Sequence, residues 1–490
     1  MEVTMNLPTV TTFVVYLVAM MAIGIAAYRL TSNMSDYVLG GRSLNAGVAA
    51  LSAGASDMSG WLLLGLPGAM YASGMNQIWI AIGLTIGAYL NWQFVARRLR
   101  VYTEVADDAI TVPDYLERRF DDTSKILRVI SAAVILLFFA FYTSSGLVAG
   151  AKLFEASFGL SYTASLWIGG LVIISYTFLG GFLAVSWTDF IQGILMFLAL
   201  VIVPLVGIQA MGGWGATVSQ VGSMDPSYND ALSGMTLFSI VSLMAWGLGY
   251  FGQPHIIVRF MAIRSHHDVP TARLIGIAWM VLGLFGAIFT GYVGYAYFAD
   301  NPLQDSEKVF ILLSTTLANP WIAGVLLAAI LAAVMSTIDS QLLVSSSALA
   351  EDIYKPFVRP NATQNELVWV GRLAVAGIAL IALIIAGNPD SKVLGLVSYA
   401  WGGFGAAFGP VIIGSLFWRR MTRNGALAGI IVGAVTVVVW KQLSGGIFEM
   451  YEILPGFVLC AVAIVVASLL GQPTGHMTET FDKAVAEWQG

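Results

Sequence analysis

Charged residues are scarce in this chain. Asp, Glu, Lys and Arg make up 10% of its 490 residues, while 58% are hydrophobic, whereas soluble domains carry roughly a quarter charged residues. So few charges cannot cover the surface of a water-soluble protein of this length. Lipid must cover much of that surface instead. The net charge of −5 is less informative about the protein than the positions of its charged residues along the chain.

Cysteine and histidine are also rare. The one cysteine, Cys460, excludes an internal disulfide and lies in the apolar run 457–470. The chain has four histidines, and His266 and His267 are adjacent in a charged stretch, so we expect no transition-metal centre. No glycine-rich phosphate loop, basic nucleic-acid patch or nucleophile–base set is visible, so we expect neither an enzyme nor a nucleic-acid partner. No Lys or Arg precedes the first apolar run, so we expect no secretory signal.

Long apolar runs are the dominant feature that is present. A spanning helix needs about 20 apolar residues, and the sequence predicts an all-α polytopic membrane protein with thirteen such helices. The expected spans are residues 9–29, 46–72, 76–96, 127–153, 162–182, 188–212, 236–262, 272–298, 320–345, 368–387, 393–417, 425–442 and 453–471.

The basic residues predict the orientation of these spans. With the N-terminus outside, all but four of the 23 Lys and Arg residues fall on the inner side, as the positive-inside rule requires. The four exceptions are Lys152, Lys308, Lys392 and Lys441. We therefore expect an outer N-terminus, a cytoplasmic C-terminus and one transmembrane domain over residues 1–490. We expect residues 472–490 to be a short, solvated cytoplasmic tail.

Two of the spans contain residues that weaken helices at membrane depth. The second reads Ser52–Trp61 (SAGASDMSGW) and continues through Pro67, and the seventh reads Trp246–Pro254 (WGLGYFGQP). Irregular backbone is tolerated there only where it is buried or lines a cavity. The two spans are five apart and so cross in opposite directions, which is the arrangement of an inverted-repeat transporter.

Asp57 is the strongest single candidate for a functional residue. A carboxylate inside a membrane is costly and needs a partner, and no Lys or Arg is expected at its depth. We interpret Asp57 as a charge that helps to bind a cation. The structural alternative is a salt bridge or a hydrogen bond at a helix end, the interpretation that we give to Asp189, Glu351 and Asp352.

A second polar cluster comprises Ser336, Thr337, Asp339 and Ser340. Hard cations prefer oxygen ligands, which these hydroxyls and carbonyls freed at the break could supply. Back-bonding of the hydroxyls to their own helix is the equally weighted alternative. Asp339 could either tune such a site or line the inner vestibule.

Aromatic residues form the third candidate group. Trp246 and Tyr250 are four residues apart and share a helix face, and Tyr142 lies in the middle of the fourth span. They could form a pocket for a small ring or organic cation. Ordinary helix packing is the alternative, and it would prevail without further support.

These segments resemble the sodium/solute symporter family. The resemblance lies in Tyr37–Leu44, Ser52–Trp61, Tyr176–Gln192, Trp246–His255, Ile330–Thr337 and Leu394–Pro410 and extends over the whole chain. It implies a LeuT-like core of two inverted five-helix repeats over about 45–417, with one helix before it and two after. It also implies uptake of a small solute with co-transported sodium across a bacterial plasma (inner) membrane, and proline is the expected solute.

The resemblance also implies roles for particular residues. Sodium would be held by the carbonyls of Ala55, Met58 and Ala333 and by the hydroxyls of Ser336 and Thr337. Asp57 would support the ion and couple it to the solute. The residues expected to line the solute pocket are Ser59, Gly60, Trp61, Tyr142, Trp246, Tyr250 and Pro254. We expect a chain that functions as a monomer in the bilayer.

Three alternatives remain open at this point. A symporter for another amino acid, pantothenate or a carboxylate would share these features. A non-transporting sensor on the same scaffold would normally carry a signalling domain, and the tail after Gln472 is short. A channel would pass sodium without solute and would not accumulate it.

Overall fold

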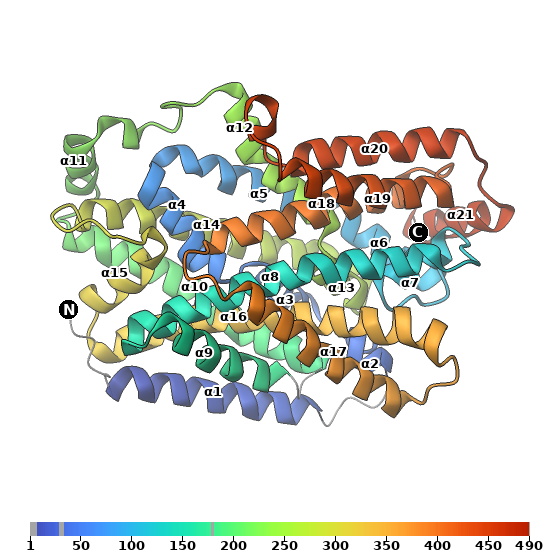
Figure 1. Cartoon of the computed structure of the whole chain (residues 1–490), viewed down its shortest axis with the longest axis horizontal. Helices are drawn as coiled ribbons and strands as arrows, with labels where there is room; N and C mark the ends of the chain where they lie inside the picture. Colours follow the sequence, from blue (N-terminus) through green and yellow to red (C-terminus); the bar gives the residue numbers. More distant parts are fainter. Residues whose placement is uncertain (1–6, 29–33, 178–180, 490) are drawn as a thin grey trace.

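The computed structural model describes residues 7–28, 34–177 and 181–489. Over these residues the chain is helical and forms no strand, apart from a single bridge between Leu44 and Ile263. Most helices run along the long axis of the molecule (Figure 1). Arg29, counted above on the inner side, and residues 178–180 of the run 176–192 lie outside the described residues.

The first half of the chain forms sixteen helical elements before residue 230, in which η marks 3-10 or π turns. They are α1 (Leu7–Tyr28), α2 (Met34–Leu39), η1 (Gly40–Arg42), α3 (Ala46–Asp57), η2 (Trp61–Gly65), α4 (Leu66–Ser73), η3 (Met75–Gln77), α5 (Ile78–Leu90), η4 (Asn91–Ala96), α6 (Arg97–Val105), α7 (Val112–Arg119), α8 (Ile126–Phe158), α9 (Tyr162–Thr177) and α10 (Phe182–Ala210), followed by α11 (Trp214–Met224) and η5 (Pro226–Asn229).

The second half continues in the same way. It contains α12 (Leu237–Met244), η6 (Ala245–Gly252), α13 (Pro254–Ala262), η7 (His266–Asp268), α14 (Val269–Tyr297), η8 (Ser306–Lys308), α15 (Val309–Leu317), α16 (Pro320–Ser347), η9 (Ala348–Val358), α17 (Gln364–Ile385), α18 (Val393–Phe417), α19 (Arg423–Trp440), η10 (Gly446–Glu449), α20 (Ile453–Leu469) and α21 (Gly475–Gln489).

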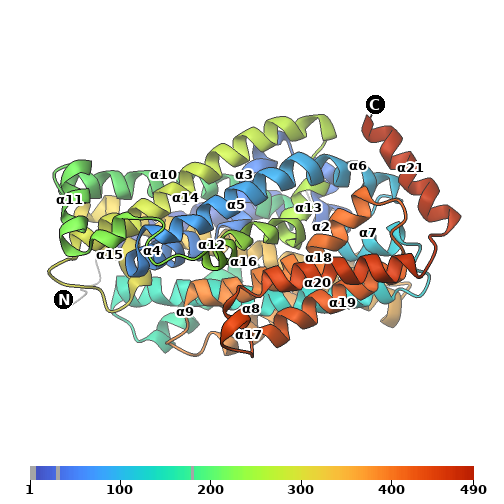
Figure 2. The ribbon, with the colours of Figure 1, turned by 90° about the horizontal axis from the view of Figure 1, so that it is seen from above.

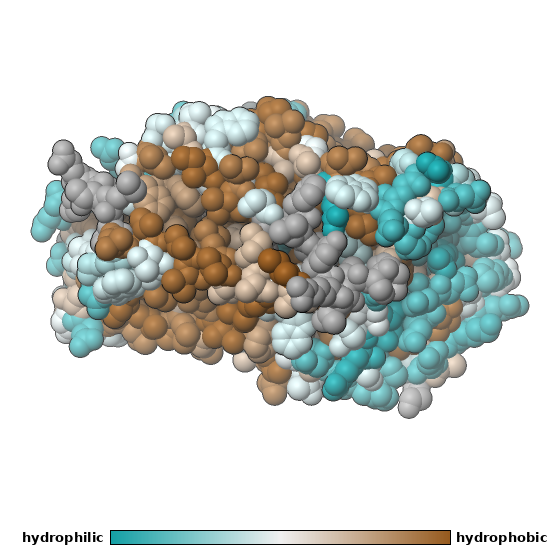
Figure 3. Space-filling view, turned by 90° about the horizontal axis from the view of Figure 1, so that it is seen from below, coloured by the Kyte–Doolittle hydropathy of each residue, from teal (hydrophilic) through white to brown (hydrophobic). Residues whose placement is uncertain are grey.

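The lengths of these helices fit a polytopic membrane protein. Among the described residues, nine helical stretches are long and apolar enough to cross a membrane, and shorter apolar helices cover 162–175, 237–252 and 453–469. The second expected span is the broken helix α3–η2–α4. A broad apolar surface covers much of the face in Figure 3, and hydrophilic residues gather at one end.

Both expected breaks are present. α3 ends at Asp57, Met58 leaves the helical region (φ −86°, ψ 77°), and the helix resumes at Gly60–Trp61. α12 tightens into the 3-10 helix η6, Gln253 is extended, and Pro254 opens α13. Proline suits the first turn of a helix because it lacks the N–H that would have no partner there. The small and polar residues in the two runs thus mark true interruptions.

The helices that pack against the two breaks enclose them within the bundle. α3 packs against α10, α13, α14 and α16, while η6 packs against α5 and α18. In Figure 2, α10 and α14 lie along one side of the molecule and α18, α19 and α20 along the other. The broken helices therefore lie inside the bundle, where irregular backbone is shielded from lipid.

The C-terminal segment differs from the solvated tail that we expected. It forms α21, which packs against α6 and α7 (Figure 1). Met477 and Phe481 are buried, and the Arg98 guanidinium lies 3.9 Å from the ring centroid of Trp488. The expectation was wrong because apolar residues at helical spacing give this short, polar segment one face that can pack.

Candidate functional site

The carbonyl of Ala55 is freed by the break in α3. In an unbroken helix it would accept the N–H of Ser59, but that N–H instead bonds to the carbonyl of Asp57 at 3.0 Å. The Ala55 oxygen accepts the hydroxyl of Ser336 at 2.8 Å and that of Thr337 at 3.2 Å, both from α16. Two discontinuous parts of the chain therefore meet through oxygen atoms.

This cluster contains most of the atoms expected to hold sodium. The Ser336 hydroxyl also lies 3.1 Å from the carbonyl of Ala333, and Met58 is fully buried at the break. Back-bonding to the same helix thus occurs, as the alternative required, but both hydroxyls also reach across to Ala55. Hydroxyl and carbonyl oxygens keep lone pairs that a hard cation can use.

Asp57 lies at the same break and has hydroxyl partners. Its Oδ2 accepts the hydroxyl of Tyr250 at 2.5 Å, and its backbone carbonyl accepts the indole N–H of Trp61 at 3.0 Å and the hydroxyl of Tyr142 at 3.1 Å. Its Oδ1 is buried and has no hydrogen-bond partner among the described residues. Asp57 therefore joins three of the aromatic residues singled out from the sequence.

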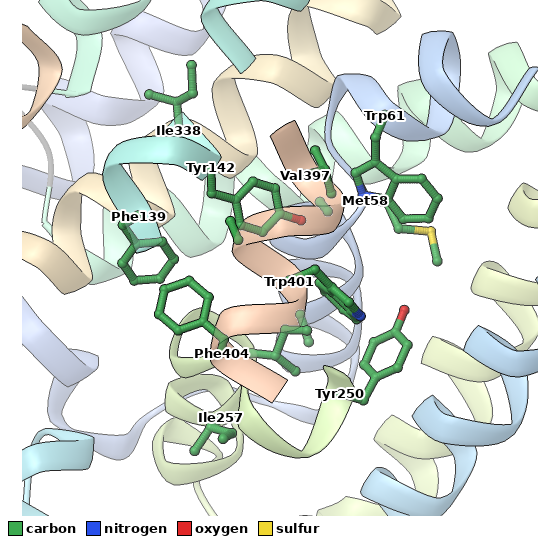
Figure 4. Close-up of a cluster of buried hydrophobic side chains, with 14 of the residues drawn as sticks. Met58, Trp61, Phe139, Tyr142, Tyr250, Ile257, Ile338, Val397, Trp401 and Phe404 are labelled. Carbon is green, nitrogen blue, oxygen red and sulfur yellow. The ribbon is translucent and has the colours of Figure 1, made fainter. Parts of the chain in front are cut away.

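Trp61, Tyr142 and Tyr250 belong to one cluster of buried side chains, shown in Figure 4. The rings of Trp61 and Trp246 lie 6.2 Å apart between centroids, and Tyr250 meets Trp401 edge-on at 5.0 Å. Trp401 was not predicted, although its indole N–H donates to the carbonyl of Trp246 at 2.7 Å. A tryptophan in a glycine-rich part of its span was the available signal.

Ser59 and Gly60 lie at the restart of the broken helix, beside this cluster. Both are buried, and a Cβ on Gly60 would lie 2.5 Å from the Cβ of Ala149 in α8. Pro254 lies elsewhere, in the wall of a small cavity shared with Thr111 and Asp352. It shapes the second break without lying among the aromatic rings.

A buried ionic cluster was missed by the sequence analysis. Arg259 was counted with the basic residues of the inner side, but its side chain is fully buried in α13 and lies 3.2 Å from Asp189. It also donates to the hydroxyls of Ser52 and Ser340, at 3.1 and 2.5 Å. Both carboxylate oxygens of Asp339 are buried without a hydrogen-bond partner among the described residues.

The burial of this arginine was missed because the sequence does not show where a span ends when apolar residues flank a charge. The expected span 236–262 already contained Arg259. Its position within an apolar run was therefore the signal that it is buried and paired. The pairing expected for Asp189 is present, with Arg259 as its partner.

The four exceptional lysines lie in ion pairs at one end of the molecule. Lys152 bonds to Asp305 at 2.8 Å and to Glu307 at 2.7 Å, and Lys392 bonds to Asp305 at 2.9 Å. Partial burial raises the pKa of Asp305, but the hydrogen bonds from Lys152 and Lys392 outweigh it and lower the pKa to about 2. Asp305 therefore stays ionised at neutral pH and ties α8 to the start of α18.

In this all-helical membrane protein an oxygen cluster lies at one broken helix, and the hydrogen bond from Tyr250 to Asp57 joins that helix to the other broken helix. This is the architecture of a solute transporter. The profile of the sodium:solute symporter family matches residues 37–433. The chain belongs to this family.

Relatives with full-length similarity are known from several bacteria. The sodium/proline symporter of Salmonella typhimurium is 57% identical over 98% of this chain and 97% of its own. The high-affinity proline transporter PutP of Bacillus subtilis is 53% identical over 94% of this chain and 98% of its own. Among solved structures, a Na+-coupled sialic acid symporter in a substrate-bound outward-open state matches with a TM-score of 0.81 at 19% identity, over 96% of this chain and 99% of that one.

Proposed function

We propose that this chain imports L-proline together with sodium by alternating access. Membership of the symporter family supports sodium as the coupled ion, and the proline-carrying relatives support the solute. The observation that carries the proposal is the carbonyl of Ala55, freed at the break of α3 and met by Ser336 and Thr337. Such a junction can bind a hard cation and respond to it by moving two elements together.

Sodium would be held where α3 meets α16. Its ligands would be the carbonyls of Ala55, Met58 and Ala333 and the hydroxyls of Ser336 and Thr337. By joining the broken helix to α16, the ion would stabilise one arrangement of the two elements. The negative charge of Asp57, two residues from Ala55, would favour the ion.

Proline would bind beside the ion. The helix restarts at Gly60–Trp61, and the first N–H groups of a helix have no partner within it and favour an anion such as the proline carboxylate. The ring and ammonium would lie among the aromatic side chains. The residues proposed to line this pocket are Ser59, Gly60, Trp61, Tyr142, Trp246 and Tyr250, with Pro254 shaping the second break.

Asp57 would couple the two sites. Its carboxylate accepts from Tyr250 in η6, while its backbone carbonyl accepts from Trp61 and Tyr142. A cation near Asp57 would therefore order the groups that surround proline, and proline would in turn favour sodium binding, because coupling between two sites is reciprocal.

The same proposal includes the arrangement in the membrane. We infer thirteen crossings, an outer N-terminus, a cytoplasmic C-terminus and a monomer in the bacterial plasma membrane. The core over about 45–417 would consist of two inverted five-helix repeats that rock around the central site. The positions of the breaks in α3 and in α12–η6, and the location of the four lysines at one end, support this arrangement.

One sodium ion can drive uphill uptake. A charge crossing 100 mV yields about 2.3 kcal/mol, and a tenfold sodium gradient adds about 1.4 kcal/mol. Proline is zwitterionic and adds no net charge. The sum of about 3.7 kcal/mol supports accumulation of a few hundredfold at one-to-one coupling.

The test is uptake of labelled proline into proteoliposomes that contain the purified chain. We expect uphill accumulation with an inward sodium gradient and its collapse when an ionophore dissipates the gradient. Unlabelled alanine, pantothenate and acetate serve as competitors and should leave uptake unchanged. Absence of proline uptake in vesicles shown to be sealed, or stronger competition by one of these solutes, would contradict the proposal.

A further inference from the structure

A surface groove of about 550 Å³ lies between α5 and α14, which run side by side (Figure 2). Its lining is mainly apolar, with Leu274, Ile277 and Leu282 contributed by α14. Tyr89 of α5 and Arg273 of α14 also border it. The groove is therefore a hydrophobic surface with one charged side chain near its end, and it is separate from the residues proposed to hold sodium and proline.

The groove has the length of one leaflet of a bilayer. Its two helices belong to stretches long and apolar enough to cross a membrane, Met75–Val105 and His266–Tyr297. From Arg273 to Leu282, α14 advances by about 13 Å at 1.5 Å per residue, and the hydrocarbon of one leaflet is about 15 Å thick, half of a core of about 30 Å. The guanidinium of Arg273 thus lies at the level of the lipid headgroups when Leu282 lies near the middle of the bilayer. Tyr89, beside the arginine, is of a residue type enriched at that level.

Arg273 has no acidic partner in the part of the chain that the structure describes. Its guanidinium donates to the side-chain oxygen of Gln93 and lies 5.7 Å from the ring centroid of Tyr89. Asp268, the acidic residue nearest to it in the sequence, pairs instead with Arg264 at 2.6 Å. A guanidinium has five N–H donors and can hold a phosphate through two parallel hydrogen bonds. Arg273 therefore keeps donors for a phosphate at the end of the groove.

The charges beyond this end of the groove are also positive on balance. Arg97 opens α6 about two turns beyond Tyr89 on the same helical stretch, and its Nε has no hydrogen-bond partner among the described residues. Arg100 pairs with Glu104 at 2.6 Å, so that pair adds no net charge. An excess of positive charge attracts anionic lipid. It disfavours a zwitterionic headgroup, whose ammonium group it repels.

We infer that this groove binds an anionic phospholipid of the inner leaflet. The phosphate bonds to Arg273, and one acyl chain lies along Leu274, Ile277 and Leu282. A small soluble anion would use only the arginine and leave the apolar lining uncovered, whereas an uncharged lipid would leave the arginine without an anion. The choice of leaflet rests on the proposed orientation of the chain, but the binding itself requires neither sodium nor proline.

The test is native mass spectrometry of the purified full-length chain after its own lipids have been removed in detergent. Phosphatidylglycerol and phosphatidylethanolamine with the same acyl chains are titrated separately, and the apparent dissociation constant of the first bound lipid is measured. We expect phosphatidylglycerol to bind several-fold more tightly. Sodium and proline are absent, so the result does not depend on the proposed transport.

Arg273→Gln removes the charge and should weaken phosphatidylglycerol binding roughly fivefold, the contribution of one basic residue near a membrane surface. Phosphatidylethanolamine binding should change less. Arg420→Gln is the matched control, since Arg420 is an exposed arginine between α18 and α19 that does not line the groove. It should leave both affinities unchanged.

Ala278→Trp fills the groove and leaves Arg273 in place. Ala278 is exposed and lines the groove, so the larger side chain should occupy the place of the acyl chain and weaken phosphatidylglycerol binding several-fold. Val458→Trp, on the exposed face of α20, adds the same ring elsewhere on the apolar surface. It should bind lipid as the wild type does.

The inference is wrong if the two lipids bind the wild type equally, or if Arg273→Gln binds phosphatidylglycerol as tightly as the wild type. It is also wrong if Arg420→Gln weakens binding as much as Arg273→Gln, since any surface arginine would then serve. A dimer of the wild type that dissociates in the Ala278→Trp chain would assign the groove to a second copy instead. None of these results bears on proline uptake, so the proposed function stands or falls separately.

Discussion

At the scale of single residues, the break in α3 places a carboxylate and a free carbonyl two positions apart. Ala55 bonds to hydroxyls of α16, and Asp57 bonds to a hydroxyl of η6. Neither contact involves a cationic side chain. A cation could thus enter this region without displacing an existing ion pair, which makes Asp57 and the hydroxyls separately testable.

Replacing Asp57 with Asn should raise the sodium concentration needed for half-maximal proline uptake by about tenfold or more. The amide keeps the shape of the side chain but removes the charge that favours the ion, a difference of at least about 1.4 kcal/mol. Sodium activation of uptake in proteoliposomes is the measurement. Asp300→Asn, in an exposed loop, is the control, and unchanged sodium activation in the Asp57→Asn chain would remove this residue from the ion site.

The double change Ser336→Ala with Thr337→Ala should also raise the sodium requirement, since it removes two of the five proposed ligands. Ser347→Ala is a matched control, because the Ser347 hydroxyl bonds back to Val344 at 2.8 Å within its own helix. We expect the control to activate at the wild-type sodium concentration. If the double variant did the same, the two hydroxyls would be structural and sodium would bind elsewhere.

At the scale of elements, the discontinuous helix fits its neighbours closely at Gly60. A Cβ at this position would lie 2.5 Å from the methyl group of Ala149 and 3.3 Å from a methyl carbon of Val334. α8 and α16 thus hold the restart of the broken helix from two sides. The close approach explains why glycine stands at this point, beside the groups proposed to hold sodium and the solute.

Gly60→Ala should therefore sharply reduce proline uptake, because the added methyl displaces the restart of the helix from α8. Combining it with Ala149→Gly removes the clashing methyl and should restore part of the activity. Uptake is compared at equal amounts of protein in the membrane, with Ala149→Gly alone as the control. Equal activity of Gly60→Ala and wild type would show that this contact does not hold the site.

The elements also show which structural features local sequence patterns predict and which they miss. Glycine, proline and polar residues predicted both breaks within a few residues, because they weaken helices wherever they occur. The same patterns did not show that Arg259 is buried and paired, and they left out Trp401, since burial of a side chain depends on which helix packs against it. The packing of the helical C-terminal segment was missed for a related reason. Its short apolar face can be recognised as buried only once α6 is known to lie beside it.

At the scale of the whole molecule, the basic residues fall into two groups at opposite ends. At one end, Lys152 and Lys392 pair with Asp305, Lys308 pairs with Glu155, and Lys441 pairs with Glu452. The arginine-containing helices α6 and α7 lie at the other end, close to the C-terminus (Figure 1). This separation along the long axis is what an oriented membrane protein requires.

A thiol at position 301 should react with an impermeant reagent added to intact cells, whereas one at position 267 should react only after the membrane is opened. The variants are Asn301→Cys and His267→Cys in a Cys460→Ala chain. Both positions are exposed, and the native thiol is buried. The reverse labelling pattern would invert the proposed orientation.

The amino-acid sequence by itself determined that this is a helical membrane protein, where its helices break, and which family it resembles. Each of these follows from composition or from neighbouring residues, because helix formation and membrane insertion respond to local patterns. Only the tertiary structure decided that Ala55 meets Ser336, that Arg259 pairs with Asp189, and that Arg273 borders a groove between α5 and α14. The residues of the first pair are 281 positions apart, and contacts over such distances arise from the packing of whole helices, which no local pattern specifies.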